Sequence, residues 1–484
     1  MTHMPVSTLR TSFTVLTAAL LLAGCGAVVH TPYQQPAFQA PERWQEETAP
    51  TAHDATNQPE HAATGHDWWR RFDDPVLISL VEQAIARNND LAVAAIRVRR
   101  AQLQAGLAQD NRLPQLSASG QAGTSRRIDE SARWSESDSA SASVKYELDL
   151  WGRLSSLHDS ARWEALATEE DRRSAELSLI GSTMDLYWQA SYNRQRLQNS
   201  EASIAHARTT LDLVRAQFDA GAVSPLEVAE AEQNLYGQEA SHQQLQQDLQ
   251  ETLNALSILF DAPPGGQFDI PALLPNTALP DIAPGLPAGL LARRPDLQAA
   301  ELRLRRTLSS SDAVRASYYP SISLTGSLGS SSTALSSVLN SPVATLGIGI
   351  NLPFLQWNQM NLNIAASKAE YEEAVTGFRQ ALYVAMSEVD NTLSARLKLA
   401  SQGQLLERTL ASAQQAETLY EVRYRLGAVP LRSWLDAQEK RRTAEINVAQ
   451  NRFSQYSNMV TLYKALGGDT DQEPIASADT SGRR

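Results

Sequence analysis

The chain repeats a pattern of residues at a constant spacing of 206 positions, the difference between Asp296 and Asp90. Each copy has an Asp-Leu step, then a proline, and much later a Gly-Ala-Val run. The matching positions are Asp90 and Asp296, Pro114 and Pro320, and Gly221 and Gly427. Solenoid repeats are only a few tens of residues long. We therefore interpret the pattern as one architectural unit present twice, and the content of that unit largely decides the fold.

The composition favours long helices over a nucleic-acid surface. The 484 residues include 42 Lys and Arg against 54 Asp and Glu, a formal charge of −12. Because nucleic acid is itself an anion, this acidic balance argues against it as a partner. Ala, Leu, Gln, Glu and Arg dominate the middle of the chain, which is typical of long helices.

The amino terminus predicts a lipid anchor. Residues 11–24 are apolar and small, and they are too few to span a membrane and remain there. They end in Leu22-Ala23-Gly24-Cys25, a run that resembles the bacterial lipobox. The resemblance implies that residues 1–24 are a signal peptide and that Cys25, the only cysteine, carries S-diacylglycerol and N-palmitoyl groups. Gly26 favours the outer membrane. The alternative is an ordinary secretory signal with an incidental cysteine.

Each unit opens with predicted helices and then changes to strand periodicity. Apolar residues at helical spacing predict helices over residues 75–87 and 90–110, and over 297–317 in the second unit. After Pro114 and Pro320 the apolar residues alternate with polar ones, which is the period of a strand. The alternating segments cover residues 115–122, 140–150, 321–328 and 343–350. Each unit thus supplies one pair of amphipathic strands.

These strands are candidates for crossing a membrane. No other stretch approaches about 18 consecutive apolar residues, the minimum for a membrane helix, so a spanning segment would have to be a strand. One face of the strands is rich in Ser and Gln, and the loops 124–136 and 330–340 are long and polar. A soluble sheet is the alternative. Four strands cannot close a membrane barrel, which needs about eight, so spanning strands require several copies of the chain.

Two long helical hairpins follow the strand pairs. Residues 155–218 contain no proline and predict a helix on the order of 100 Å long, at about 1.5 Å per residue. A turn at 221–225 leads into a return helix over 226–260. The second unit repeats this arrangement with helices over 364–426 and 431–466. Apolar steps of three and four residues predict coiled-coil packing.

The sequence therefore predicts a mainly helical, internally duplicated protomer with four membrane strands. The expected segments are a signal peptide (1–24), a lipidated tether (25–70), a first repeat (71–260), a connector (261–287), a second repeat (288–467) and a flexible tail (468–484).

Several short motifs carry a family resemblance through their order and spacing. They are Trp68-Trp69-Arg70-Arg71-Phe72, Ala86-Arg87-Asn88-Asn89-Asp90, Tyr146-Glu147-Leu148-Asp149-Leu150-Trp151-Gly152-Arg153, Arg293-Arg294-Pro295-Asp296-Leu297, Tyr319-Pro320-Ser321 and Leu435-Asp436-Ala437-Gln438. Together they resemble the outer membrane factors, the TolC-like channels of Gram-negative export systems. The resemblance is closest to the NodT/OprM-like efflux lipoproteins.

The resemblance implies a homotrimer with a 12-stranded outer-membrane barrel, four strands from each chain, and a coiled-coil periplasmic tunnel. It implies a passive channel of a tripartite efflux or export system. Such a channel receives substrates from a periplasmic adaptor and an inner-membrane transporter of the RND or ABC type. It would be lipid-anchored in the cell outer membrane, would span it in contact with its lipids, and would extend into the periplasm.

The resemblance also places a gate at the hairpin turns, around Gly221 and Gly427, where an adaptor or pump would make contact. Tyr424 matches a gate tyrosine, and Asp436 matches an aspartate of an acidic lumenal ring. Coiled-coil packing of Tyr424 and a solvated helix surface at Asp436 are the alternatives.

Two further positions are gate candidates, and two depart from the family pattern. Glu227 stands where a carboxylate is common, with a solvated surface as the alternative, and Arg425 is a candidate basic partner. Val429 occupies a position that is basic in some members, and Ser433 occupies that of a second ring aspartate.

Enzymatic function is not expected. The sequence contains no glycine-rich phosphate loop, nucleophile elbow or metal-ligand spacing, so we expect no catalytic residue, metal or further cofactor. His53, His61 and His66 lie in the predicted tether, which favours a linker over a metal site. Two non-enzymatic alternatives remain. A periplasmic adaptor lipoprotein would have one helical hairpin, and a structural coiled-coil lipoprotein without a pore would not need amphipathic strands.

Overall fold

The computed structural model describes residues 29–39, 41, 43–44, 67–126, 128, 134–280, 282, 289, 293–333, 336 and 339–468. These residues form two compact units. Unit 1 contains the described residues up to Phe38, with Ile96–Glu170 and Ala299–Ala381; unit 2 contains Gln39–Ala95, Asp171–Gln298 and the described residues from Leu382 onward. Both sequence repeats contribute to each unit. The predicted signal peptide 1–24, Cys25 and the tail beyond Gly468 lie outside the described residues.

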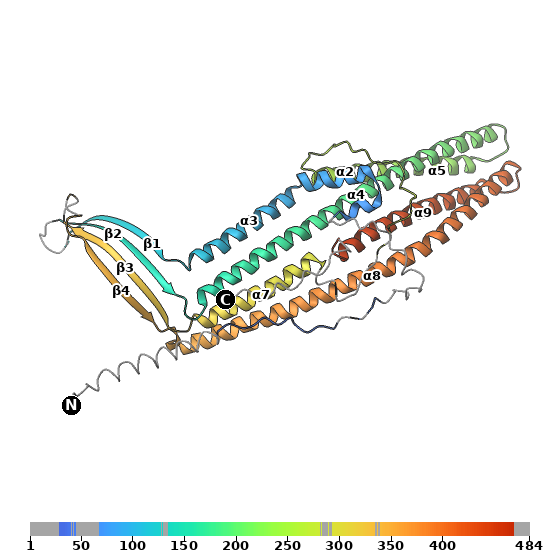
Figure 1. The fold of residues 1–484 in the computed structure, drawn as a ribbon. Coiled ribbons are helices and arrows are strands. Elements are labelled where there is room, and N and C mark those ends of the chain that lie inside the picture. The colour runs from blue at the N-terminus through green and yellow to red at the C-terminus, as the bar shows by residue number, and fades with distance from the viewer. Residues whose placement is uncertain are drawn as a thin grey trace, which may run out of the picture. The chain divides into compact units, whose positions relative to one another are not determined.

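Four antiparallel strands form one sheet in unit 1. They are β1 (Gln115–Ser125), β2 (Ser135–Leu148), β3 (Ser321–Ser332) and β4 (Val343–Asn351), paired in the order β1-β2-β3-β4 (Figure 1). The central pairing joins the two repeats, with Ala142 of β2 opposite Leu328 of β3. Within one chain, β1 and β4 are therefore the edges of this sheet.

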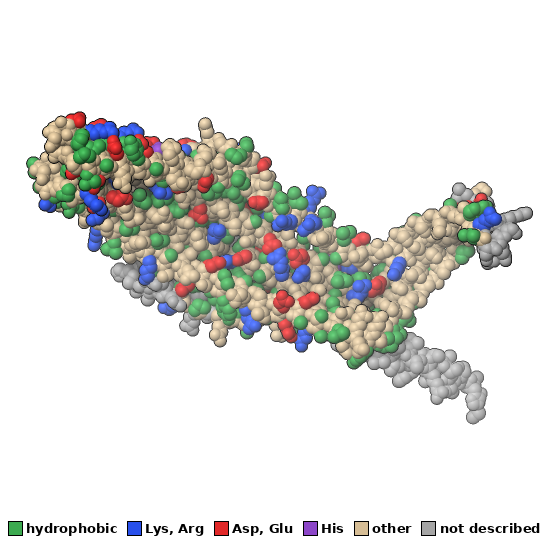
Figure 2. All heavy atoms as spheres, turned by 180° about the vertical axis from the view of Figure 1, so that it is seen from behind, with side chains coloured by type: hydrophobic (Ala, Val, Ile, Leu, Met, Phe, Trp, Pro, Cys, Tyr) green, Lys and Arg blue, Asp and Glu red, His purple; other side chains and the backbone are tan. Residues whose placement is uncertain are grey.

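The register gives the sheet two chemically different faces, as the alternation predicts. Leu116 lies opposite Val144 on one face, whereas Ser117 lies opposite Ser143 on the other, with their hydroxyl oxygens 2.8 Å apart. The apolar face is uncovered in the single chain, where Leu346 keeps 91% of its surface exposed. β1, β3 and β4 contain no charged residue, and charged side chains are correspondingly sparse over the sheet in Figure 2.

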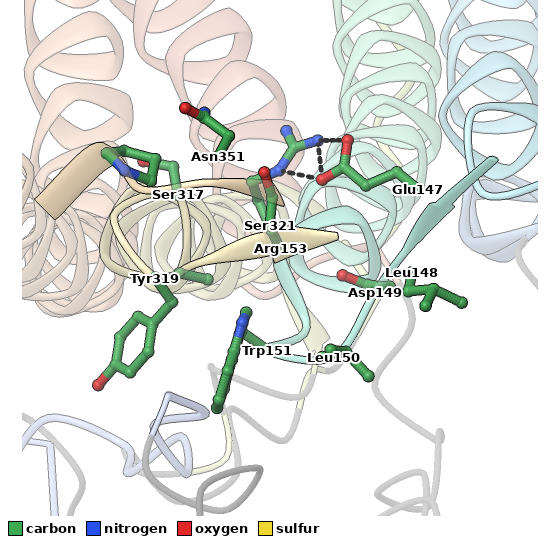
Figure 3. A pocket seen from close by; sticks show the side chains of 12 residues that line it. Glu147, Leu148, Asp149, Leu150, Trp151, Arg153, Ser317, Tyr319, Ser321 and Asn351 are labelled. Atoms are coloured by element: carbon green, nitrogen blue, oxygen red, sulfur yellow. Dashed lines mark hydrogen bonds and ion pairs between the residues drawn. The ribbon is translucent and has the colours of Figure 1, made fainter. Parts of the chain in front are cut away.

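A polar junction in unit 1 carries β2 into helix α4 (Arg153–Asp219) (Figure 3). Asp149 accepts hydrogen bonds from the backbone nitrogens of Leu154 at 2.9 Å and Ser155 at 2.8 Å, so it satisfies donors that the first helical turn leaves free. Arg153 donates from Nη2 to both carboxylate oxygens of Glu147, at 2.8 and 2.9 Å. The junction is thus fixed by side chains of the Glu147–Arg153 motif.

Aromatic residues connect this junction to the second repeat. Nε1 of Trp151 donates to the carbonyl oxygen of Pro320 at 2.6 Å, and its ring centre lies 5.1 Å from that of Tyr319. Trp151 and Tyr319 border a cleft of about 280 Å³ whose lining also includes Ser321 and Asn351 (Figure 3).

The corresponding junction of the second repeat corrects one expectation. Helix α8 covers Trp357–Arg425, and therefore begins before the predicted start at residue 364. A short 3-10 turn, η5 (Pro353–Leu355), leads into it, and the backbone nitrogen of Met360 donates to the carbonyl of Gln356 at 2.9 Å. The polar residues between 356 and 363 hide the apolar period. No proline follows Pro353 in this stretch, so the helical hydrogen bonds continue.

Unit 2 is a bundle of helices around aromatic side chains. Four elements lie wholly in unit 2: η2 (Trp68–Phe72), α2 (Pro75–Arg87), α5 (Pro225–Leu259) and α9 (Leu431–Ala465). Four helices are divided between the units: α3 (Asn89–Asp110), α7 (Pro295–Ala316), α4 and α8. Unit 2 contains the second parts of α4 and α8. Trp68 stacks on Tyr463 with ring centres 4.7 Å apart, and Trp188 lies 4.6 Å from Tyr456. Trp68 and Trp69 are buried, so the folded structure includes the end of the range expected to be a tether, 25–70. None of the described helices is both long and apolar enough to cross a membrane.

The described part of the connector, residues 261–280 and 282, contains no helix or strand, and residues 268–277 contact two helices of unit 2. Arg194 of α4 donates to the carbonyl oxygen of Phe268 at 3.4 Å. Arg452 and Tyr456 of α9 both donate to the carbonyl oxygen of Pro275, at 3.2 and 3.1 Å. Side-chain donors therefore satisfy backbone acceptors that have no partner in regular structure.

The segment that follows the predicted lipid anchor is bound to α7 in unit 1. The backbone nitrogen and the hydroxyl of Thr31 each donate to a carboxylate oxygen of Asp312 at 2.7 Å. Asp312 is only 2% exposed, so these bonds compensate its burial. The guanidinium of Arg305 lies over the ring of Tyr33 at 4.4 Å. Residues 29–38 are thus part of the folded unit.

Candidate functional site at the helical hairpin turns

The ends of both helical hairpins pack on one apolar cluster in unit 2, which we call the turn cluster. α4, α5, α8 and α9 all contribute to it (Figure 1). Its buried members are Ile204, Ala207, Leu211, Val214, Ala231, Leu235, Tyr424, Leu431 and Trp434. Because both hairpins share this cluster, the two turns are held next to each other.

The two turns have the same backbone geometry. Gly221 and Gly427 both have φ of 73°, a left-handed conformation that side chains disfavour. The backbone nitrogen of Ala222 donates to the carbonyl of Gln217 at 2.8 Å, and Ala428 donates in the same way to Arg423 at 2.8 Å. This is the Schellman ending of a helix. The glycines therefore lie at the turns where the sequence places them, and their contact with a partner stays a prediction.

Tyr424 is buried in the turn cluster and joins the second hairpin to the first. It is 6% exposed, and its ring stacks on Trp434 with centres 5.4 Å apart. Its hydroxyl donates to Oε1 of Gln217 on α4 at 2.7 Å. Burial raises the pKa of Tyr424, and the negative charge of Glu227 adds to the rise. The hydroxyl therefore stays protonated and serves as a donor between the hairpins.

Glu227 has a local structural role that the sequence analysis did not assign to it. The backbone nitrogen of Ser224 donates to its carboxylate at 3.0 Å, and the backbone nitrogen of Leu226 donates to the Ser224 hydroxyl at 3.2 Å. This capping box begins α5. The hydrogen bond from the Ser224 hydroxyl is the main cause that lowers the pKa of Glu227. The Ser-x-x-Glu spacing was the sequence signal for it.

The other two candidates lie on the surface. Arg425 is exposed and pairs with Glu421 of its own helix at 2.6 Å. Asp436 is exposed on α9. The structure therefore brings Tyr424 and Glu227 near each other, but it joins neither Arg425 nor Asp436 to them by a hydrogen bond or ion pair between described residues. Their roles in a gate stay predictions.

Further residues that sequence reasoning missed hold each hairpin together. Nη2 of Arg215 contacts Glu232 at 2.7 Å between α4 and α5. Arg441 of α9 pairs with Glu417 of α8, and also with Glu445 at 2.6 Å. The Arg215–Glu232 and Arg441–Glu417 pairs form between helices, so no spacing within one helix could have indicated them. They connect the two arms of each hairpin beyond the turn itself.

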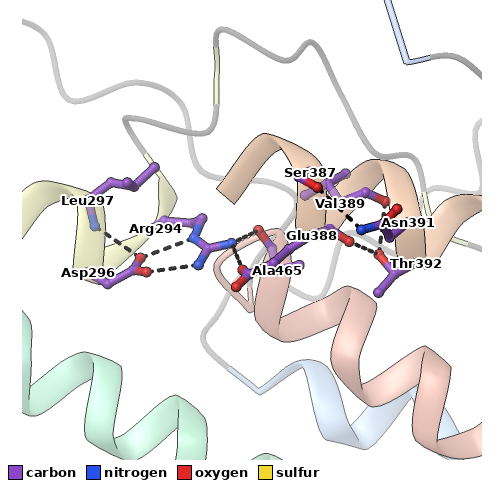
Figure 4. Close-up of polar contacts among 9 residues, drawn as sticks. All are labelled: Arg294, Asp296, Leu297, Ser387, Glu388, Val389, Asn391, Thr392 and Ala465. Atoms are coloured by element: carbon purple, nitrogen blue, oxygen red, sulfur yellow. Dashed lines mark hydrogen bonds and ion pairs between the residues drawn. The ribbon is translucent and has the colours of Figure 1, made fainter. Parts of the chain in front are cut away.

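A polar cluster, also in unit 2, gives a structural role to the Arg293–Leu297 motif. Arg294 donates to Asp296 at 3.1 and 2.8 Å, to Glu388 at 2.7 Å and to the carbonyl oxygen of Ala465 at 3.2 Å (Figure 4). Burial alone would raise the pKa of Asp296, but the hydrogen bonds and charge of Arg294 outweigh burial and lower that pKa. The cluster fastens the start of α7 to α8 and α9, which is a structural task.

The described residues contain no group of three or more His, Cys, Asp or Glu side chains arranged to hold a metal ion. The turn site is a helical assembly in which exposed charges surround a buried aromatic pair.

Comparison with known proteins gives a consistent family. A family model described as outer membrane efflux protein matches residues 80–260 and 286–468. The pyoverdine export outer membrane protein OpmQ of Pseudomonas putida is 33% identical over 440 residues, which cover 88% of this chain and 92% of that protein. The probable efflux pump outer membrane protein TtgC of Pseudomonas putida is 29% identical over 459 residues, which cover 93% and 94%.

Solved structures share the fold. The outer-membrane channel OprN aligns with a TM-score of 0.76 and 25% identity, covering 91% of this chain and 99% of that one. The open state of the Neisseria gonorrhoeae MtrE outer membrane channel aligns with a TM-score of 0.74 and 26% identity, covering 90% and 97%. These matches confirm the predicted TolC-like fold class. With a family model matched in both repeats, the chain belongs to the outer membrane efflux protein family.

Proposed function

We propose that three copies of this chain close one passive outer-membrane efflux channel. The observation that carries the proposal is the open sheet, whose edge strands β1 and β4 have no further partner among the described strands and whose apolar face is exposed. In a bilayer, an unpaired strand edge costs several kcal/mol for each unsatisfied backbone group, so the sheet has to close. One chain supplies four strands, fewer than the eight or so that a small barrel needs. Three chains would supply 12 strands, with the apolar face toward lipid and the serine face toward water.

The lipid anchor is part of the same proposal. Cys25 precedes Thr31 by six residues. An extended chain covers at most about 3.5 Å per residue, so acyl chains on Cys25 would attach within about 20 Å of Thr31. The Thr31–Asp312 bonds support this placement because they fix the segment on α7, which leads directly into β3.

The hairpin turns would form the gate and the contact with a periplasmic adaptor. The adaptor would connect the channel to an inner-membrane transporter of the RND or ABC class. Tyr424 is the strongest gate residue, because its bond to Gln217 joins the two hairpins and must break if they separate. The channel would carry out no chemistry and would need no metal or cofactor beyond its acyl groups.

The proposal is tested with full-length protein purified in mild detergent. We expect a trimer by light scattering and stepwise currents in planar bilayers. On gels, we expect a trimer band in unheated samples that is replaced by a monomer band after heating. Mass spectrometry of the amino-terminal peptide should find acyl groups on Cys25. A monomer that carries no current would contradict the channel, whereas an unmodified Cys25 in a conducting trimer would remove only the anchor.

Asp436 is tested separately. A ring of carboxylates raises the local cation concentration in a pore. We expect Asp436→Asn to lower the preference for K⁺ over Cl⁻ and to raise single-channel conductance. The control is Glu407→Gln, which changes an exposed carboxylate on a different helix, α8. Equal ion selectivity in the two variants would mean that Asp436 is a solvated surface residue with no role in the pore.

A further inference from the structure

The two hairpin turns carry opposite net charge although they occupy duplicated positions. Residues 212–232 contain five acidic residues and one basic residue, a formal charge of −4. The matching residues 418–438 contain two acidic and three basic residues, a formal charge of +1. Asp219 and Arg425 are at matching positions, so the charge at this position changes sign between the two turns.

Ion pairs inside each hairpin leave this difference uncancelled. Arg215, the only basic residue of the acidic stretch, already pairs with Glu232. Arg425 pairs with Glu421 in the basic stretch. The exposed charges outside these two pairs are Asp212 and Asp219 at the end of α4. Beside the second turn they are Arg423, Arg432 and one acidic residue, Asp436. Each turn therefore offers its own sign to the solvent.

Large apolar side chains are exposed among these charges. Leu226 at the first turn is 64% exposed, and Leu426 at the second is 78% exposed. Figure 2 shows acidic, basic and hydrophobic side chains gathered at this end of the hairpins. Exposed apolar groups with a charged rim are typical of a protein–protein contact, in which the charges select and orient the partner.

We propose that the two turns form one bipolar docking surface, acidic on the α4–α5 side and basic on the α8–α9 side. The turn cluster holds both sides together within unit 2, so one partner tip can contact both. The occupant is the tip of a periplasmic adaptor with an apolar residue at its centre. It presents a basic side chain to the α4–α5 turn and a carboxylate to the α8–α9 turn. This inference rests on the adaptor contact of the proposed function and adds the chemistry that selects the adaptor.

The duplication supplies substitutions that the same backbone already accommodates. Asp219→Arg places at the first turn the residue found at the second, and Arg423→Gln places there the residue found at Gln217. Asp219→Asn removes the charge with almost no change of shape. The matched controls are Glu201→Gln and Lys440→Gln, which remove exposed charges farther from the turns.

The experiment measures binding of a purified periplasmic adaptor from the same organism, using full-length channel in detergent at 50 and 500 mM salt. At low salt we expect the affinity to fall about tenfold for Asp219→Arg and about threefold for Asp219→Asn and Arg423→Gln. High salt should reduce each difference to less than about twofold, because the charges are exposed. The controls should bind like the wild type.

Four outcomes would overturn the inference in different ways. If the wild type binds but all variants match the controls, the charges do not select the partner. If Asp219→Arg lowers the affinity and Arg423→Gln raises it, the contact surface of the partner is basic throughout and has no carboxylate for the second turn. A change in the oligomeric state of Asp219→Arg without adaptor would identify a second copy of this chain as the occupant. No binding by the wild type would instead contradict the adaptor contact itself.

Discussion

The turn between α4 and α5 and the turn between α8 and α9 have the same backbone but different means of stabilisation. Both reverse at a glycine with φ of 73°. The first is followed by the Ser224–Glu227 capping box. The second has Pro430 at the N-cap position of α9, where no side chain caps the helix. Gly221 and Gly427 thus fix the path of the chain, and the neighbouring residues are free to diverge.

The second turn has aromatic packing where the first has little. Tyr424 and Trp434 stack in the turn cluster, and their counterparts in the first repeat are Phe218, which is exposed, and Val228. A polar cap therefore stabilises one hairpin end and a buried aromatic pair stabilises the other. The comparison teaches that a duplicated hairpin can keep its geometry while one copy becomes the contact between hairpins.

The largest effect should follow removal of the aromatic packing. Trp434→Ala should cost about 3–4 kcal/mol of local stability, because it leaves a cavity in the turn cluster. The matched change Val228→Ala should cost only about 1 kcal/mol, since the side chain is smaller and partly buried. Hydrogen exchange followed by mass spectrometry over residues 424–435 and 218–229 measures both. Equal protection losses would erase the proposed difference between the turns.

The capping box should account for the next largest effect. Ser224→Ala should destabilise the start of α5 by about 1 kcal/mol. The reciprocal pair Pro430→Ser with Ser433→Glu transfers the cap to α9 and should slow hydrogen exchange there. Glu227→Gln, which keeps an acceptor, is the milder control for Ser224→Ala. If the transferred cap leaves exchange in α9 unchanged, the missing cap does not explain why the second turn relies on packing.

A smaller effect is expected from the hydroxyl of Tyr424. Tyr424→Phe removes the bond to Gln217 but keeps the stack on Trp434, so the loss should be at most about 1 kcal/mol. If this bond holds the hairpins closed, the variant should open more often in bilayer recordings. Phe218→Tyr, the reverse change at the matching position, should leave the recordings unaltered. An unchanged open probability for Tyr424→Phe would make that residue a packing residue only.

The smallest effect is a pH dependence confined to the first turn. The pKa of Glu227 is lower in the folded protein than its ordinary value, chiefly because of the Ser224 hydroxyl. A lowered folded pKa stabilises the fold above the unfolded pKa of about 4.3, and that contribution is lost as pH falls through the folded value. Exchange rates corrected for intrinsic pH effects should therefore rise below about pH 4 in the first turn relative to the second, where Ser433 replaces Glu227. Identical profiles would contradict this assignment.

The same comparison explains what the sequence could predict. The alternation of Leu116 and Ser117 requires a two-faced strand, and glycine with its repeated neighbours requires a turn, so local patterns are enough for both. The burial of Tyr424 depends on α4 and α9 together, and the Thr31–Asp312 bonds join residues 281 positions apart. No local pattern encodes such contacts. The cap formed by Glu227 is local, and the Ser-x-x-Glu spacing is enough to predict it.

The start of α8 shows the limit of periodicity. Residues 356–363 are polar enough to conceal the apolar stripe, yet they form helix because nothing in them removes a backbone donor. The absence of a helix-breaking residue therefore indicates the start of α8 better than the apolar period does.

The central claim is that copies of this chain close a channel whose hairpin ends restrict it. Planar-bilayer recording of the purified full-length trimer, with wild type and Trp434→Ala compared under one voltage protocol, tests it most directly. We predict small, stepwise currents for the wild type and a larger, longer-lived conductance for the variant. A trimer of either form that inserts but carries no current, or a variant indistinguishable from the wild type, would contradict the account.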